Sequence, residues 1–310
     1  METRFLIIDG NSLACRAAFA HNPNFGPDLQ TKDGKVTGGI FRFFTMFDKI
    51  LKQIRPTHVI VGWDVNRHNW RKQVYPLYKA NREKKDETLF VQFEDIKNIL
   101  NAIGIKNIGV IGYEGDDIVG TYVSKSKATK NFIVSGDKDC YQLVNDNTSI
   151  VFPKVGFSEI ELITPEYILN KYDIPVEQFV DLKALMGDAG DNVPGIDGCG
   201  EKTAIKLLKH YGSAKEVSNN KDNIDIKGVN KKVKAGIQEW SKQSDLIIDL
   251  VTIRKDIPEQ FLFDYDSCYI GNEINWDGAY QLFKELEFNA LINKMHEGGL
   301  YGYKSVFWWK

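Results

Sequence analysis

The sequence has few cysteines, and their arrangement does not indicate a structural metal site or a disulfide framework. None of the four forms a C-x-x-C pair, and none has zinc-site spacing with histidine. We therefore expect reduced thiols, as in a cytoplasmic protein. The five histidines are scattered and no H-E-x-x-H motif is present, which argues against a zinc hydrolase.

Long apolar runs are also absent. No stretch of 18 or more apolar residues occurs, so we expect no membrane span. The first apolar stretch, RFLIIDG, is too short for a signal peptide and ends in an acid. With 310 residues and 43% hydrophobic content, the chain is long enough for one large domain or two modest ones.

Net positive charge is missing as well. The formal net charge is −2, which taken alone argues against a protein that binds nucleic acid through overall positive charge. The charges are unevenly distributed, however. Residues 65–87 carry seven Lys and Arg against three Asp and Glu, and residues 200–234 carry nine against four. The local distribution is therefore more informative than the total.

The first half of the chain alternates between short apolar runs and helical patterns. This alternation predicts an α/β fold, with a parallel-rich central sheet flanked by helices. From about residue 165 the pattern is mostly helical, and no internal repeat is evident. The connection 64–88 is long, basic and aromatic, as functional or disordered connections are. We predict strands at 4–8, 57–63, 106–112 and 131–136, and helices at 11–20, 37–54, 88–103 and 115–127.

Carboxylates follow each of the four predicted strands. The carboxyl ends of strands in an open parallel sheet form the ligand crevice, so we expect these side chains on one rim. Any one of them alone could be a turn former or a helix N-cap, and adjacent acids could complement a helix dipole. The seven residues are Asp9, Asp64, Glu114, Asp116, Asp117, Asp137 and Asp139.

Seven carboxylates on one rim would repel one another unless cations neutralise them. Oxygen ligands without cysteine or histidine suit Mg²⁺ or Mn²⁺. A carboxylate-lined magnesium site most often acts on phosphate groups. The sequence therefore predicts a metal-dependent enzyme with a phosphate-containing substrate.

The run GDAGDNVPGIDGCGEKTA adds two further acids and a glycine-rich turn. If a helix continues to near Asn192, Asp188 and Asp191 share one of its faces and can meet the rim. An ordinary helix–turn–helix packing element is the alternative for the glycine-rich part. A P-loop is excluded, because Glu201 separates Gly200 from the following lysine and no strand precedes the loop.

The glycine-rich turn and the helix after it are suited to binding phosphates. Gly198 and Gly200 permit close approach of the backbone, and the helix begins with free N–H groups. Lys202, Lys206 and Lys209 lie along that helix and can neutralise phosphates.

Five motifs, taken in chain order, resemble those of the flap endonuclease / 5′-nuclease family. They are IIDGNSL, WDVNRHNWRKQVYPLYKANR, YEGDDIVG, VSGDKDCYQLV and GDAGDNVPGIDGCGEKTA, which together cover about residues 1–210. The length and the G-D-x-G-D-N spelling are similar to the stand-alone bacteriophage members. Residues from about 260 onward resemble no family.

The resemblance implies a fold and an activity. It implies a nuclease core at 1–176 with a helical arch at about 65–92. Residues 177–310 would hold a helix–hairpin–helix (helix-3-turn-helix) region and C-terminal helices. The implied activity is a structure-selective 5′-nuclease cutting at 5′ flaps, nicks or 5′ ends of DNA, and RNA primers, during replication by a two-metal mechanism.

The resemblance also implies that the protein binds two or more Mg²⁺ ions, for which Mn²⁺ could substitute, and a K⁺ ion at the hairpin. The first metal site would use Asp9, Asp64, Glu114 and Asp116, and the second Asp117, Asp137, Asp139, Asp188 and Asp191.

Basic and aromatic residues receive roles by the same resemblance. Lys79 and Arg82 would stabilise the transition state over the scissile phosphate, and Tyr78 would stack on an unpaired base. A solvated basic face is the alternative for these residues. The other expected DNA contacts are Arg71, Gly198, Gly200, Lys202, Thr203 and Lys206.

The implied partners are branched or nicked duplex DNA and RNA/DNA primers, with no membrane. We expect a monomer in the cytoplasm, that of the host if a phage encodes it. The aromatic end VFWWK could pack on the core, or contact a sliding clamp or single-strand-binding protein. Two alternatives stay open: a PIN-like ribonuclease, and an inactive protein that binds DNA junctions.

Overall fold

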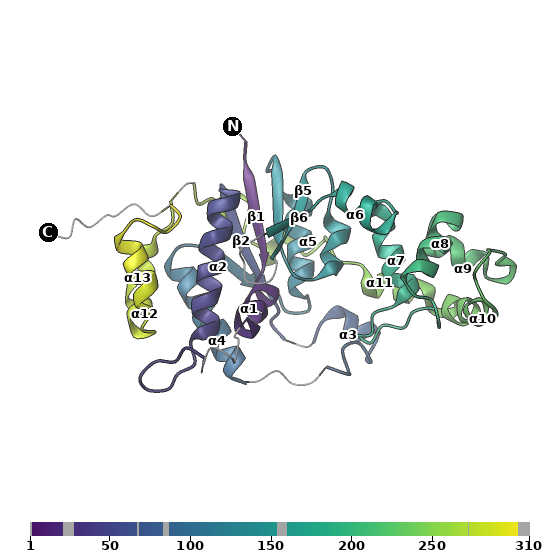
Figure 1. Cartoon of the computed structure of the whole chain (residues 1–310), viewed down its shortest axis with the longest axis horizontal. Coiled ribbons are helices and arrows are strands. Elements are labelled where there is room, and N and C mark those ends of the chain that lie inside the picture. Colours follow the sequence, from purple (N-terminus) through teal and green to yellow (C-terminus); the bar gives the residue numbers. More distant parts are fainter. Residues whose placement is uncertain are drawn as a thin grey trace.

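A six-stranded sheet forms the centre of the computed structural model, which describes residues 2–20, 28–66, 68–82, 87–153, 160–271 and 273–302. The strand order is β3-β2-β1-β4-β5-β6, and only β6 is antiparallel to its neighbour (Figure 1). The strands are β1 (Arg4–Asp9), β2 (His58–Trp63), β3 (Lys106–Gly109), β4 (Lys130–Val134), β5 (Thr148–Pro153) and β6 (Ile160–Ile163).

The central strand β1 is buried on both faces, as strands of parallel sheets are. Its alternate side chains enter two different apolar clusters. Leu6 and Ile8 belong to one, and Phe5 and Ile7 to the other. The pairing of Asp9 with Gly62 aligns the carboxyl ends of β1 and β2, and β4 lies on the other side of β1. Side chains that follow these strands therefore emerge at one edge.

Helices cover both faces of the sheet (Figure 1). On the face of Leu6 lie α1 (Gly10–Phe19), α2 (Gly38–Ile54) and α4 (Glu87–Ala102), with the C-terminal helices α12 (Tyr280–Glu285) and α13 (Asn289–His296) packed beside them. On the face of Phe5 lie α5 (Gly115–Lys125) and α6 (Pro165–Tyr172). Buried Asp48 links α2 to the C-terminal part of the chain. It pairs with Lys294 of α13 and accepts a hydrogen bond from the Tyr301 amide at 2.8 Å.

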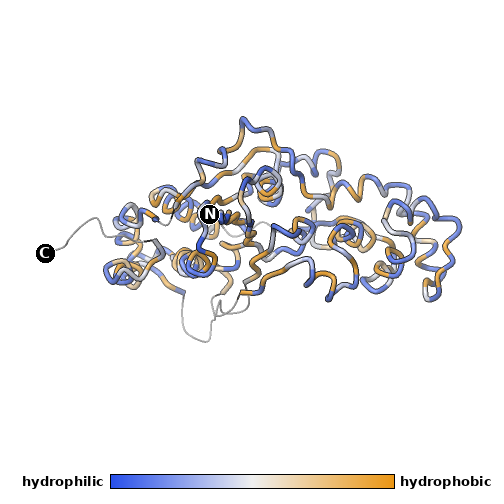
Figure 2. Tube along the Cα trace, turned by 90° about the horizontal axis from the view of Figure 1, so that it is seen from above, coloured by the Kyte–Doolittle hydropathy of each residue, from blue (hydrophilic) through white to orange (hydrophobic). Residues whose placement is uncertain are grey.

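The remaining helices form one end of the molecule (Figure 1). Hydrophilic and hydrophobic stretches alternate within their turns (Figure 2), as amphipathic helices with one buried face require. The helices are α7 (Phe179–Met186), α8 (Glu201–Tyr211), α9 (Ala214–Asn219), α10 (Lys231–Trp240) and α11 (Ser244–Val251). None of the described helices is both long enough and apolar enough to span a bilayer.

The four predicted strands and four predicted helices of the first half are confirmed, with small shifts at their ends. The sequence patterns missed β5 and β6, which are short apolar runs between polar turns, and α3 (Trp70–Val74), which has a single turn. Residues 67 and 83–86 of the expected arch, and the expected aromatic contact at the C-terminus, lie outside the described residues. The domain division at 176/177 stays a prediction.

One expected helix end is wrong. Helix α7 ends at Met186 and does not continue to near Asn192. Gly187 has a φ of +73°, and a Cβ on it would lie 2.3 Å from the Gly195 amide nitrogen. Only glycine fits this approach, so the helix stops and residues 188–194 form a loop.

We expect Phe283→Ala to lower the free energy of unfolding by about 3 to 5 kcal/mol, because it leaves a cavity in a packed core. Phe283 is fully buried, with its ring centroid 5.8 Å from that of Phe44. Urea denaturation followed by circular dichroism measures the change. The control is Phe261→Ala, which removes a ring that is 49% exposed and should cost about 0.5 kcal/mol or less. Equal losses in the two variants would contradict this packing.

Candidate active site

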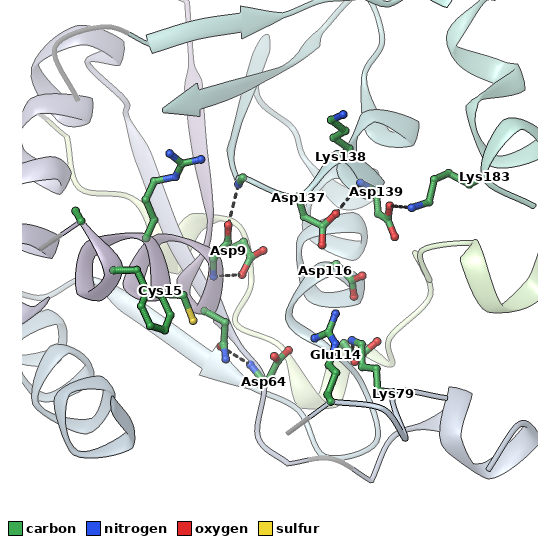
Figure 3. Close-up of a pocket in the computed structure, with 17 residues that line it drawn as sticks. Asp9, Cys15, Asp64, Lys79, Glu114, Asp116, Asp137, Lys138, Asp139 and Lys183 are labelled. Atoms are coloured by element: carbon green, nitrogen blue, oxygen red, sulfur yellow. Dashed lines mark hydrogen bonds and ion pairs between the residues drawn. The ribbon is translucent and has the colours of Figure 1, made fainter. Parts of the chain in front are cut away.

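Carboxylates from separate elements meet in one cleft of about 1070 Å³ at the carboxyl edge of the sheet. In Figure 3 the side chains of Asp9, Asp116 and Asp137 point toward the same space. Six of the seven acids expected on one rim of the sheet therefore line this cleft. The charged residues that line the cleft are Asp9, Asp64, Glu114, Asp116, Asp137 and Asp139, with Arg16, Lys79, Arg82, Lys138 and Lys183.

Asp9 is held at the end of β1 by two hydrogen bonds. Its carboxylate caps α1 by accepting from the Ser12 amide at 3.0 Å, and it accepts from the Ser135 hydroxyl at 3.0 Å. Burial, joined by the charges of Asp64 and Asp137, raises its pKa to about 7. The neutral form of this side chain is thus favoured unless positive charge is supplied.

Two further acids of the cleft have raised pKa values. Burial, with the charges of Asp117 and Glu114, raises the pKa of Asp116 well above its usual range, although Arg71 opposes the shift. Burial and the charge of Asp137 raise the pKa of Asp139 to about 6. The cleft therefore concentrates negative charge that its own cations only partly balance.

This donor set fits a divalent cation. Its ligating atoms are carboxylate oxygens, which Mg²⁺ and Mn²⁺ prefer, and the raised pKa values show that added positive charge would stabilise the ionised forms. No three acidic, histidine or cysteine side chains in the described ranges form a complete metal-binding group. The carboxylates would therefore hold ions together with water and substrate oxygens, as is usual for Mg²⁺.

Lys79 and Arg82 line the cleft and lie in the segment that follows α3. Lys79 pairs with Glu114, and its amide donates to the Asp191 carbonyl oxygen at 2.8 Å. Burial lowers its pKa, but the charges of Glu114 and Asp191 outweigh this and raise it. Arg82 pairs with Asp191. Both expected cations thus lie beside the acids.

The structure corrects the expectations for Arg71 and Asp117, which form a buried ion pair. They are 2% and 0% exposed, and each guanidinium Nη donates to one Asp117 oxygen at 2.9 Å. Asp117 also accepts from the Trp70 ring nitrogen at 3.1 Å and the Arg254 amide at 2.8 Å. Its oxygens are engaged outside the cleft, and Arg71 is not accessible to DNA.

The expectation for Tyr78 is corrected too. Its ring is 3% exposed, so it cannot stack on a base in this structure. The hydroxyl lies 2.8 Å from Glu114 and 2.9 Å from Asp191, and so links the two carboxylates. Tyr78 is a support for the cleft wall.

Asp188 lies in the loop after α7 and does not line the cleft. Sequence reasoning missed its neighbour Lys183, whose ammonium group is 2.6 Å from both Asp188 and Asp139. Burial lowers the pKa of Lys183, but the two carboxylates outweigh this effect. The net result is a raised pKa, so the lysine stays charged. Its position five residues before Asp188, just ahead of the motif GDAGDNVPGIDGCGEKTA, was the available signal.

The expected DNA contacts of the glycine-rich turn lie outside the cleft, at the helical end of the molecule (Figure 1). Gly198 has a φ of +75°, and Gly200 is the N-cap of α8. Lys202 and Lys206 are exposed, while Thr203 is half-buried.

Solved structures share this fold. The T5 5′-exonuclease is 21% identical, with a TM-score of 0.56, over 82% of this chain and 88% of that chain. A T5 flap endonuclease crystallised with DNA and metal ions is 21% identical, with a TM-score of 0.61, over 81% of this chain and 89% of that chain. The catalytic core of Rad2 in complex with DNA substrate is 16% identical, with a TM-score of 0.60, over 92% and 88%.

Curated relatives at higher identity are bacterial. The DNA polymerase I of Bacillus subtilis is 35% identical over 297 residues, which are 95% of this chain and 32% of that protein. The DNA polymerase I of Lactococcus lactis subsp. cremoris is 37% identical over 302 residues, which are 96% of this chain and 34% of that protein. The chain spans about a third of the length of these relatives. The similarity continues past residue 260, which corrects the expectation that the tail resembles no family.

Two family models match consecutive parts of the chain. The 5′-3′ exonuclease N-terminal resolvase-like domain matches residues 4–173, and the 5′-3′ exonuclease C-terminal SAM fold matches residues 174–270. The first model ends beyond β6 and α6, and the second contains the glycine-rich turn. With the carboxylate cleft in the first part and more than half of the sequence matched, the chain belongs to the 5′-3′ exonuclease family.

Proposed function

We propose that this protein is a divalent-metal-dependent nuclease that hydrolyses phosphodiester bonds at 5′ flaps, nicks and 5′ ends of DNA, and of RNA primers, during replication. The observation that carries this proposal is the cleft, in which six carboxylates face Lys79 and Arg82. Oxygen ligands for metals and cations for phosphate are two requirements of metal-dependent phosphodiester hydrolysis.

The metal ligands we propose are the six carboxylates that line the cleft. Asp9, Asp64, Glu114 and Asp116 would hold one Mg²⁺, and Asp137 and Asp139 a second. Asp188, linked to Asp139 through Lys183, and Asp191, paired with Arg82, would support them from outside the lining. Mn²⁺ would substitute. Such ions, when bound, polarise the scissile phosphate and lower the pKa of a bound water.

The chain itself would orient the phosphate and balance its charge. Lys79 and Arg82 would donate to phosphate oxygens and stabilise the negative charge that develops in the transition state. The Lys79 backbone is in the left-handed region, with a φ of +52°. The hydrogen bond from its amide to the Asp191 carbonyl oxygen holds it there. Glu114 and Asp191 keep the two cations at the cleft before substrate arrives.

Gly198, Gly200, Lys202, Thr203 and Lys206 would bind the duplex backbone, with a K⁺ ion at the turn. Phosphate contacts carry no base information, so cutting would be selective for structure and not for sequence. The DNA complexes of the T5 and Rad2 structures support such a substrate.

The two alternatives have less support. A PIN-like ribonuclease would not need the second family match, over residues 174–270. A junction-binding protein without activity would not need six carboxylates in one cleft. Contact of residues 306–310 with a sliding clamp or single-strand-binding protein, the monomeric state and a cytoplasmic location remain predictions from the resemblance.

The direct test is digestion of an end-labelled 5′-flap duplex with Mg²⁺, with EDTA as control. We expect short 5′ products and no cutting in EDTA. Asp137→Asn should lower the cleavage rate at least roughly a hundredfold while flap binding survives, because a metal ligand is lost and the phosphate contacts remain. Asp146→Asn, an exposed acid outside the cleft, is the control. Full turnover by the Asp137 variant would refute the assignment.

Lys79→Ala should slow single-turnover cleavage by about 10²- to 10³-fold, the usual effect of removing one donor to a developing charge. Flap affinity, measured by fluorescence anisotropy, should change far less. Lys171→Ala removes an exposed lysine outside the cleft and serves as control. Equal losses of rate and affinity in the Lys79 variant would show that this side chain only binds.

Stability without metal should fall as the pH rises from about 4 to 7. The pKa of Asp9 is about 7 in the fold and 3.8 in the unfolded chain, so the unfolded state releases a proton that the folded state retains. The free energy of unfolding then drops by about 1.4 kcal/mol per pH unit. Asp139 acts in the same direction.

Urea titrations in EDTA at several pH values measure this dependence. Asp9→Asn should show a smaller fall than the wild type, and excess Mg²⁺ should raise wild-type stability most at high pH. An unchanged pH dependence in the Asp9 variant would contradict the role given to its burial.

A further inference from the structure

Two segments that are far apart in the sequence are joined beside the cleft. The first, residues 77–82, carries the cations Lys79 and Arg82, and the second is the loop 188–194 that follows α7. The ion pair of Arg82 with Asp191 is one link between them. Further hydrogen bonds join the two segments through their main chains. The orientation of the cations therefore depends on how this loop is built.

Two asparagine side chains bind the main chain on either side of Lys79. The side-chain amide of Asn192 donates to the Leu77 carbonyl oxygen at 2.8 Å. The side-chain amide of Asn81 donates to the Ala189 carbonyl oxygen at 2.7 Å. The main-chain bond from Lys79 to the loop lies between these two contacts. The backbone at Lys79 is therefore fastened to the loop from both sides.

The conformation of Lys79 requires such support. Its positive φ occurs in a turn that is closed by the Ala80 amide, which donates to the Leu77 carbonyl oxygen at 3.0 Å. Glycine and asparagine usually occupy a turn position of this kind, and a lysine persists there only when its surroundings hold it. The carbonyl that closes the turn is the one that also accepts from Asn192. Asn192 therefore stabilises the turn from which the Lys79 side chain enters the cleft.

The loop that carries Asn192 is a firm support. The amides of Asp188 and Val193 each donate to the carbonyl oxygen of the other residue at 2.8 Å, and Gly187 and Gly195 are in close backbone contact below this pair. Asn192 has a φ of +57°, which asparagine tolerates better than most residues do. Its side-chain amide is therefore held in a defined place relative to α7.

We infer that Asn192 and Asn81 are positioning residues for the cleavage step, whose side-chain amides hold Lys79 in the orientation that directs its ammonium group into the cleft. This inference rests on the proposed function, in which Lys79 stabilises the transition state. Both hydrogen bonds lie at exposed sites, where a bond contributes little to the stability of the fold. Displacing a catalytic group by about 1 Å can cost about 10²-fold in rate, so we expect the main effect on catalysis.

The test is Asn192→Gly, which removes the amide while glycine keeps the positive φ without strain. The matched control is Glu287→Gly, which places glycine at an exposed position between α12 and α13 with a φ of +58°. Single-turnover cleavage of a 5′-flap duplex in Mg²⁺, at a series of enzyme concentrations, separates the maximal rate from the half-saturating concentration. We expect the maximal rate of Asn192→Gly to fall by about 10- to 10²-fold, with little change in half-saturation, and the control to match the wild type.

The same substitution in a Lys79→Ala background gives the decisive comparison. Without the ammonium group there is nothing left for the amide to position, so Asn192→Gly should cost far less there. Equal fold losses in the two backgrounds, in an enzyme whose wild type cuts the flap, would overturn the inference alone. Failure of the wild type to cut would refute the proposed function, and the inference with it. If Asn192→Gly lowers the melting temperature, Asn81→Ala at its exposed position gives the same two readings.

Discussion

The ion pair between Arg71 and Asp117 is the constraint on which the cleft depends. Both charges are buried, and removing either would leave the other unpaired in the interior, at a cost of about 3 to 5 kcal/mol. Arg71 also donates to the Leu250 and Thr252 carbonyls at 2.9 and 3.0 Å and to Glu114 at 3.1 Å. The segment before Lys79, the start of α5 and the chain after α11 are thereby held to one another.

Around this pair the cleft balances two opposing requirements. Burial at the strand ends, together with the charges of neighbouring carboxylates, raises the pKa of Asp9 and Asp139 and opposes their ionised forms. Two lysines reduce the repulsion among the carboxylates. Lys79 pairs with Glu114, and Lys183 pairs with Asp139. The same surplus of negative charge that weakens the metal-free fold favours divalent ions. The raised pKa values and the fit of the cleft to divalent ions therefore have one origin.

Much of this site could be predicted from the sequence because parallel strands deliver their following residues to one edge. What could not be predicted was the difference between Asp116 and Asp117. These neighbours point to opposite environments, and the deciding partner, Arg71, lies far away in the sequence. Tyr78 was misassigned for a similar reason, since only the fold shows that its hydroxyl lies between buried Glu114 and half-buried Asp191. The end of α7 at Met186 depends on the close approach of Gly187 to the Gly195 backbone, which no local sequence pattern indicates.

That contact has a consequence for how the loop between the two glycines tolerates sequence change. A Cβ on Gly195 would lie 2.1 Å from the Met186 carbonyl oxygen, and paired bonds between Asp188 and Val193 at 2.8 Å close the loop just above this stem. Its tip, at Ala189, is exposed. Libraries randomised across the loop should therefore return glycine alone at the stem and varied side chains at Ala189, whereas Asp188 and Asp191 are constrained by their pairs with Lys183 and Arg82.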